Sequence, residues 1–291
     1  MRRSVGITLY ALLCVIWGST WLVIKVGYGG LGPFNVAALR FLVAAAVLAA
    51  LVPVLGARWP HGRTEWRLVA IVGVALFAAD YGLIYWAEQY IDSGLTAILF
   101  ATLPLVTLLL AHLYVPGERI TPRRLTGTLV AVIGVVALFA GRVRVDPAAA
   151  VPMLAVVAAG VCAAIAGVAS KRHGHALHPA ALNAPAMLIG AAILAVASVL
   201  NGDGVAVPRD AGTWAAIGYL AIAGSVITFL IYFSLLKTWS VTSLSFISVF
   251  TPAVALLLGF VFRAERLSGV MALGTILILG GVALGLSKDR R

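Results

Sequence analysis

The chain has 291 residues, a net charge of +11, 62% hydrophobic and 11% charged residues, and a mean hydropathy of +1.07. These values lie outside the range of water-soluble globular proteins and exclude an ordinary soluble enzyme or binding domain. The basic residues are scattered over short segments and do not cluster on one surface, which argues against nucleic-acid binding.

Windows of about 20 residues with few charges mark segments long enough to cross a bilayer. Because lipid offers no partner to backbone N–H and C=O groups, such segments must be helices. Ten are expected, near residues 5–26, 33–55, 66–87, 93–115, 122–140, 149–170, 179–200, 212–236, 240–262 and 267–287. The sequence therefore predicts an all-α integral membrane protein with ten transmembrane helices and short connections.

The first span starts with basic residues and has no small-residue cleavage site, so we expect a retained helix and not a removed signal peptide. Tyr10, Cys14, Trp17 and Trp21 form a stripe along it. We assign Trp17 to a cavity. Tyr10 and Trp21 lie nearer the two interfaces, where an aromatic belt is the simpler interpretation.

Two full charges lie inside the second and third spans, Arg40 and Asp80. At 1.5 Å per residue both fall about 10 Å below the outer surface. Charges at this depth normally pair or face water. We expect an Arg40–Asp80 ion pair; the alternative is an unpaired Asp80 that faces a cavity and takes up a proton during transport.

The third span carries Tyr81 and Tyr85 on one helical face, and a shift of 147 residues reaches the eighth span. The ninth span adds three further hydroxyl groups. The predicted substrate pathway is Trp17, Tyr81, Tyr85, Ser225, Thr228, Tyr232, Ser245, Ser248 and Thr251. The alternative is that the hydroxyls bond back to their own helices and the aromatic rings fill gaps.

Pro104 and Pro252 stand near the middle of the fourth and ninth spans. A proline there removes a backbone hydrogen bond and kinks the helix, so we expect two bends near the binding region. Gly281 and Gly285 match GxxxG on the last span and predict close helix packing, within or between subunits.

One stretch of the chain occurs twice. Pro104, Leu108 to Leu110, Glu118-Arg119-Ile120 and Gly127-Thr128 recur 147 or 148 residues later; the second copy reads Pro252, Leu256 to Leu258, Glu265-Arg266-Leu267 and Gly274-Thr275. The chain thus divides into units 1–145 and 146–291 with five helices each. Because each unit has an odd number of helices, the second unit enters the membrane from the opposite side and the two form an inverted repeat. Such repeats place a substrate path between the halves and suit alternating access.

The distribution of Lys and Arg sets the orientation. With a cytoplasmic N-terminus, fourteen basic residues fall on the inner side and six on the outer side. The inner residues are Arg2, Arg3, Arg58, Arg63, Arg67, Arg119, Arg123, Arg124, Lys171, Arg172, Lys237, Lys288, Arg290 and Arg291. Both termini are therefore predicted to be cytoplasmic, and the inner charges are suited to anionic membrane lipids.

The segment from Pro104 to Gly134 and its partner from Pro252 to Gly281 resemble the duplicated EamA domain of the drug/metabolite transporter superfamily. The resemblance covers essentially the whole chain. It implies an inverted-repeat bundle with a central cavity, in a bacterial inner-membrane exporter of metabolites such as amino acids or purines. Four-helix relatives couple to protons through an acidic residue in the first helix, which this chain lacks.

We therefore expect an exporter or facilitator of small organic solutes, with drug efflux or metabolite uptake as the alternative. A non-transporting receptor and an intramembrane enzyme are remoter, since neither HExxH nor GxSxG occurs. No cofactor or metal site is expected; His173, His175 and His178 fit a solvated basic turn better. The solute, the driving force, the direction and the choice between monomer and homodimer stay open.

Overall fold

The computed structural model describes residues 3–138, 146, 149–254 and 269–286, and all its regular elements are helices. The first half contains α1 (Arg3–Gly27), α2 (Pro33–Val54), α3 (Gly62–Ile71), η1 (Val72–Asp80), α4 (Tyr81–Ala87), α5 (Ser93–Phe100), α6 (Leu103–Tyr114) and α7 (Pro122–Leu138). The second contains α8 (Ala150–His173), α9 (Pro179–Leu200), α10 (Ala211–Ala221), η3 (Ile222–Ile227), α11 (Thr228–Leu236), α12 (Val241–Ser245) and α14 (Gly269–Leu286).

These helices follow the apolar spans of the sequence. Within the described residues, seven continuous helical stretches are long and apolar enough to cross a membrane, and shorter apolar helices cover 4–20 and 241–254. The predicted class, an all-α integral membrane protein, is confirmed. The part of the second repeat from Leu256 to Leu267 lies outside the described residues.

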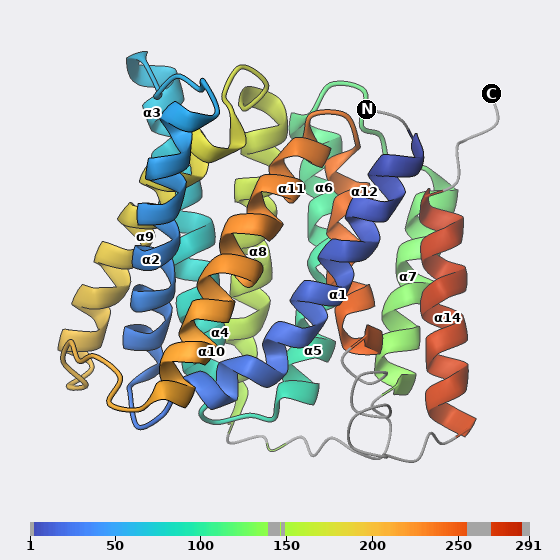
Figure 1. The fold of residues 1–291 in the computed structure, drawn as a ribbon. Helices are drawn as coiled ribbons and strands as arrows, with labels where there is room; N and C mark the ends of the chain where they lie inside the picture. Colours follow the sequence, from blue (N-terminus) through green and yellow to red (C-terminus); the bar gives the residue numbers. More distant parts are fainter. Residues whose placement is uncertain (1–2, 139–145, 147–148, 255–268, 287–291) are drawn as a thin grey trace.

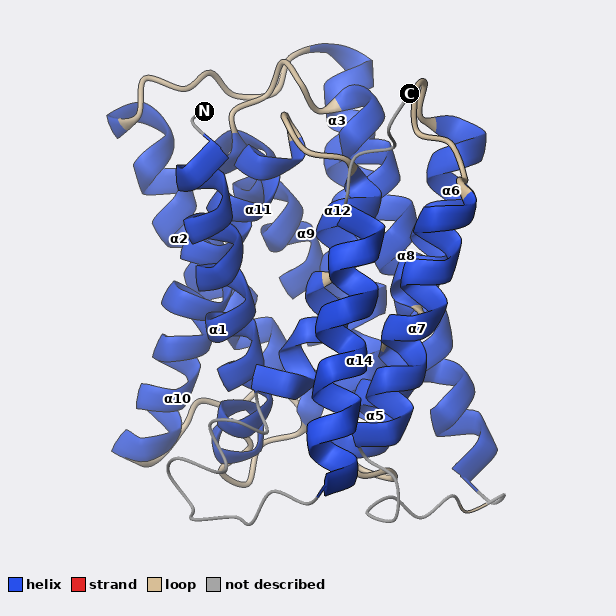
Figure 2. Ribbon diagram, turned by 90° about the vertical axis from the view of Figure 1, so that its right-hand side faces the viewer, coloured by secondary structure: helices blue, strands red, loops and turns tan. Residues whose placement is uncertain are grey.

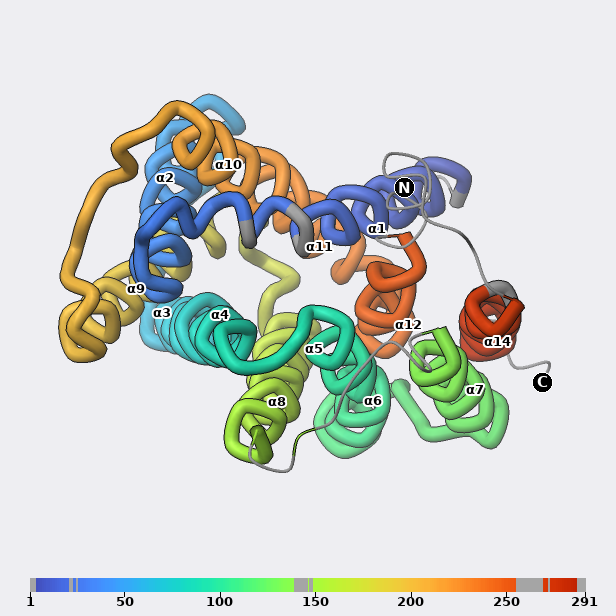
Figure 3. The backbone as a smooth tube through the Cα atoms, turned by 90° about the horizontal axis from the view of Figure 1, so that it is seen from below, coloured from blue at the N-terminus to red at the C-terminus, as the bar shows by residue number. Residues whose placement is uncertain are grey.

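The helices form one bundle with the start of α1 and the end of α14 at the same face (Figure 1). The connections α2–α3, α6–α7, α8–α9 and α11–α12 lie at this face too. Viewed along the bundle, α2 and α9 lie together at one end and α7 and α14 at the other (Figure 3). Figure 2 shows the α7–α14 pair from the side, running along each other.

Glycines let α7 and α14 touch through their backbones. A Cβ atom on Gly281 would lie 2.5 Å from the backbone nitrogen of Ala131, and one on Gly134 would lie 2.7 Å from that of Ile278. Gly285 accommodates the ring of Phe246, which a Cβ would meet at 2.5 Å. Both glycines of the GxxxG motif therefore pack within the chain, as small residues at helix interfaces commonly do in membranes.

The fourth span is divided and not bent at its centre. Helix α5 ends at Phe100 and α6 begins at Leu103, so Pro104 occupies the first turn of a new helix. Proline is well suited to that turn because its missing N–H would have no intrahelical partner there. The predicted mid-helix kink at Pro104 is thus a helix start.

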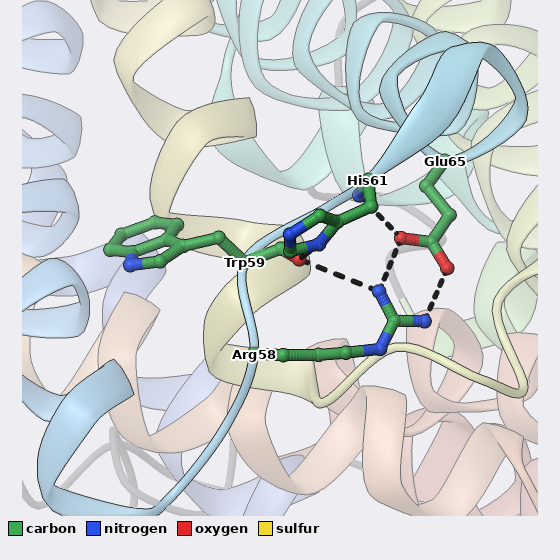
Figure 4. Close-up of polar contacts among 4 residues, drawn as sticks. All are labelled: Arg58, Trp59, His61 and Glu65. Carbon is green, nitrogen blue, oxygen red and sulfur yellow. Dashed lines mark hydrogen bonds and ion pairs between the residues drawn. The ribbon is translucent and has the colours of Figure 1, made fainter.

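The α2–α3 loop is held by a surface ion pair (Figure 4). Arg58 donates from Nη1 to Glu65 Oε2 at 2.8 Å and from Nη2 to Glu65 Oε1 at 2.5 Å. The backbone N–H of His61 donates to the same carboxylate at 2.7 Å. Glu65 lies in the first turn of α3, where an acidic side chain also complements the helix dipole.

Candidate functional site: a central cavity

A cavity of about 130 Å³ lies inside the bundle. Segments of both halves line it: α1, α2, η1, α4, α5 and α6 from the first half, and α8, α11, α12 and residues 247–251 from the second. Seven of the nine predicted pathway residues lie in its wall, namely Trp17, Tyr81, Tyr85, Tyr232, Ser245, Ser248 and Thr251.

The other two predicted pathway residues, Ser225 and Thr228, are fully buried and do not line the cavity. Ser225 Oγ accepts a hydrogen bond from Arg40 Nε at 2.8 Å and donates to the Leu220 carbonyl at 2.9 Å. It therefore belongs to the surroundings of a buried guanidinium. Thr228 Oγ1 is buried without a hydrogen-bond partner.

Arg40 makes its contacts with the second half of the chain and with Tyr85, and not with Asp80. Besides the bond to Ser225, Nη2 donates to the Gly224 carbonyl at 2.8 Å and Nη1 to the Tyr85 hydroxyl at 3.2 Å. Its guanidinium carbon lies 4.8 Å from the centre of the Tyr81 ring, within cation–π distance. The predicted Arg40–Asp80 ion pair is wrong, because equal depth on neighbouring helices does not bring side chains onto facing sides.

Asp80 ends η1 and lines the cavity with only 3% of its surface exposed. Its Oδ1 atom is buried and has no hydrogen-bond partner. On α6, Thr107 also lines the cavity, is 1% exposed, and has an Oγ1 atom without a partner. Two residues of the cavity wall thus each have a buried polar atom whose hydrogen-bonding capacity is unused.

Aromatic rings form much of the rest of the wall. Trp17 packs against Phe229 and Tyr232 with ring centroids 5.4 and 5.7 Å apart, and its Nε1 donates to the Gly224 carbonyl at 3.3 Å. Tyr81 also contacts Phe229, with ring centroids 6.4 Å apart. These contacts fix the rings in place, so the cavity has rigid walls suited to flat or apolar groups.

The hydroxyls of the ninth span donate to their own helix. Ser245 Oγ donates to the Thr242 carbonyl at 2.7 Å and Ser248 Oγ to the Ser245 carbonyl at 2.9 Å. Thr251 Oγ1 donates to the Ser248 carbonyl at 3.3 Å, which is the carbonyl that Pro252 leaves without its usual N–H donor. The three hydroxyls therefore donate to carbonyls of their own span, and all three residues line the cavity.

Contacts between distant elements lie on the side of the cavity toward the termini. The Tyr10 ring stacks on Trp239 at 5.5 Å, so Tyr10 is a buried packing residue and not part of an aromatic belt. The Glu118 carboxylate accepts hydrogen bonds from the Val241 N–H at 2.8 Å and the Thr242 hydroxyl at 3.1 Å. The side chain of Trp21 lies outside the described residues.

Lys171 closes the same region from α8. Its Nζ atom donates to the carbonyl of Leu236, the last residue of α11, and to that of Trp239 just beyond it, both at 2.8 Å. Sequence reasoning missed this contact and the Glu118 cap, although both residues belong to the repeat. The signal was the full charge of Glu118 beside a span end, where a carboxylate is suited to a helix N-terminus.

The model of the EamA-like transporter family matches residues 4–140 and again residues 151–287. An Escherichia coli K12 protein named as an uncharacterized inner membrane transporter, YedA, is 30% identical over 271 residues, 91% of this chain and 85% of that one. A probable terminal-alkyne amino-acid exporter of Streptantibioticus cattleyicolor is 29% identical over 286 residues, covering 98% and 94% of the two chains.

A probable amino-acid metabolite efflux pump of Escherichia coli K12 is 25% identical over 297 residues, covering 97% of this chain and 94% of that one. A solved crystal structure superimposes with a TM-score of 0.83 at 24% identity, over 98% of this chain and 97% of the other. At that identity the superposition shows a shared fold.

Proposed function

Because the chain belongs to the EamA-like transporter family, we propose that it exports small organic metabolites such as amino acids or purines across the bacterial inner membrane. The observation that carries this proposal is the buried cavity between segments of both halves, lined by aromatic rings, hydroxyls and one carboxyl group. Two relatives are named as an amino-acid exporter and an amino-acid metabolite efflux pump, which favours export over uptake or drug efflux.

The architecture we propose is a 5+5 inverted repeat of units 1–145 and 146–291, with both termini in the cytoplasm. Two observations support it. The family model matches twice, once in each unit. Arg3 and Leu286 lie at one face together with the loops that carry most of the basic residues, which is the pattern of a cytoplasmic surface (Figure 1).

We propose that transport proceeds by alternating access around the cavity. The Tyr10–Trp239 stack and the bonds from Glu118 to α12 join the two halves on the side toward the termini. In a cycle that opens the cytoplasmic side, these contacts have to separate. The residues proposed to meet the solute are the seven predicted ones in the cavity wall.

The test is export from cells. Overexpression in a bacterial host should raise resistance to a panel of toxic amino-acid and purine analogues and raise extracellular accumulation of the matching metabolites. Tyr232→Ala, in the cavity wall, should lose this effect at normal membrane levels. Tyr114→Ala, at an exposed tyrosine, serves as the control.

Increased sensitivity to the analogues would indicate uptake. No change in sensitivity or accumulation for any compound, with the protein present in the membrane, would refute the proposal.

A further inference from the structure

Two residues of the cavity wall have unsatisfied polar atoms. Asp80 Oδ1 and Thr107 Oγ1 are both buried, both belong to residues that line the cavity, and both are without hydrogen-bond partners. Leaving polar groups in this state is costly, and most costly for a carboxylate, so such groups normally meet a partner. In a transporter cavity the missing partner is naturally the solute.

The protein itself supplies no cation to Asp80 in the part of the chain that the structure describes. The ion pair found there joins Arg58 to Glu65 at the surface. Arg40, the other charged residue of the cavity wall, directs Nε, Nη1 and Nη2 at Ser225, Tyr85 and Gly224. The guanidinium of Arg40 is therefore used in contacts within the protein, whereas the carboxyl group of Asp80 is available to a ligand.

The surrounding wall is suited to a cation that carries an apolar body. The rings of Trp17 and Tyr232 line the same cavity, and the π-faces of such rings attract ammonium groups. On α8, the small residues Ala163 and Gly167 also line the cavity. A Cβ on Gly167 would already come within 3.2 Å of the Tyr232 hydroxyl.

We infer that Asp80 binds the ammonium group of the transported solute, with the Thr107 hydroxyl as a second acceptor. This inference rests on the proposed function and narrows it. The solute class becomes primary amines with an apolar or aromatic body, which includes amino acids and their amine derivatives and excludes neutral purines. An ammonium group offers three donors, enough for both acceptors.

Binding to the purified full-length protein tests the inference with three probes that share a phenyl ring: phenethylamine, hydrocinnamate and phenethyl alcohol. Isothermal titration calorimetry gives their dissociation constants. The wild type should bind the amine at least tenfold more tightly than the acid or the alcohol. Asp80→Asn should lose that preference by tenfold or more and leave the alcohol unchanged, while Thr107→Val should cause a smaller loss for the amine.

Asp92→Asn is the matched control, because Asp92 is an exposed carboxylate outside the cavity on the loop before α5. Asp80→Asn should fold, since it removes an unpaired buried charge at constant shape. If Asp80→Asn did not fold, the preference of the wild type for the amine over the acid would still test whether the cavity selects an ammonium group.

Equal binding of amine and acid by the wild type would overturn the inference, as would the absence of binding by any probe. Amine binding unchanged in Asp80→Asn would overturn it too and would leave the carboxyl group to proton exchange. Export of purine analogues without amine binding would refute this inference while the proposed transport function stood.

Discussion

Replacing Gly281 with alanine should push α7 and α14 apart. The new Cβ would lie 2.5 Å from the Ala131 backbone nitrogen and 2.6 Å from the Gly127 carbonyl oxygen, whereas an ordinary contact begins near 3.4 Å. The shortfall of about 0.9 Å (3.4 minus 2.5) is against backbone atoms, which cannot rotate away. Overpacking of this kind costs about 1–3 kcal/mol, so we expect a lower thermal unfolding midpoint in detergent.

The neighbouring Gly280 provides the control, because a Cβ there meets no atom within 4 Å. Gly280→Ala should leave stability unchanged or raise it by up to about 1 kcal/mol through helix propensity. Unfolding followed by gel filtration of heated samples compares the two variants directly. Equal midpoints for Gly280→Ala and Gly281→Ala would refute the close backbone contact between α7 and α14.

Three further substitutions test the cavity and its closure. Arg40→Met should reduce the yield of monodisperse protein in gel filtration, because the buried hydroxyls of Tyr85 and Ser225 lose their donor, at a cost of about 1–3 kcal/mol for each unsatisfied group. A wild-type yield would contradict this. Glu118→Ala should open the cytoplasmic side of the cavity more often. A cysteine placed at Ser248, in a background without native cysteines, should then react with a thiol reagent roughly tenfold faster if the closed state loses about 1.4 kcal/mol. An unchanged labelling rate would show that Glu118 does not help to close the cavity. Pro252→Ala restores a backbone N–H donor, which should straighten the helix and slow transport while membrane levels stay normal. An unchanged transport rate would show that the proline has a purely structural role.

The helices were predictable because bilayer thickness and backbone satisfaction leave few alternatives to an apolar helix. The contacts between side chains of different helices could not be predicted in this way. Arg40 and Asp80 lie at similar depth, but depth says nothing about rotation around the helix axis. The partners of Arg40 at Gly224 and Ser225 are about 185 residues away in sequence. No local pattern connects positions so far apart.

The candidate cavity was predicted in part, for a similar reason. Tyr81, Tyr85 and Tyr232 line it because helical spacing puts side chains on one face, which sequence can show. Ser225 lies on the equivalent stripe and still misses the cavity, since Arg40 reaches across to bond it. Thr107 had no repeat or charge to mark it; only its unpartnered burial in three dimensions does.

Segments η1 and η3 are π-helices, which are wider than α-helices, and their positions bear on how the two halves of the chain diverged. Segments η1 and η3 end at Asp80 and Ile227, which are 147 residues apart (227 minus 80), the offset of the sequence repeat. A shared departure from α-helical geometry at one position is what an ancestral feature of a single gene, duplicated later, would leave behind.

The residues at the ends of those segments differ, aspartate in one half and isoleucine in the other. Two identical half-length subunits would have to carry a carboxyl group on both sides of the cavity or on neither, and two neighbouring carboxylates repel. Fusion into one chain frees each copy to mutate alone. A single acidic group on one wall of a two-sided cavity is therefore something that gene fusion makes attainable and a symmetric dimer does not.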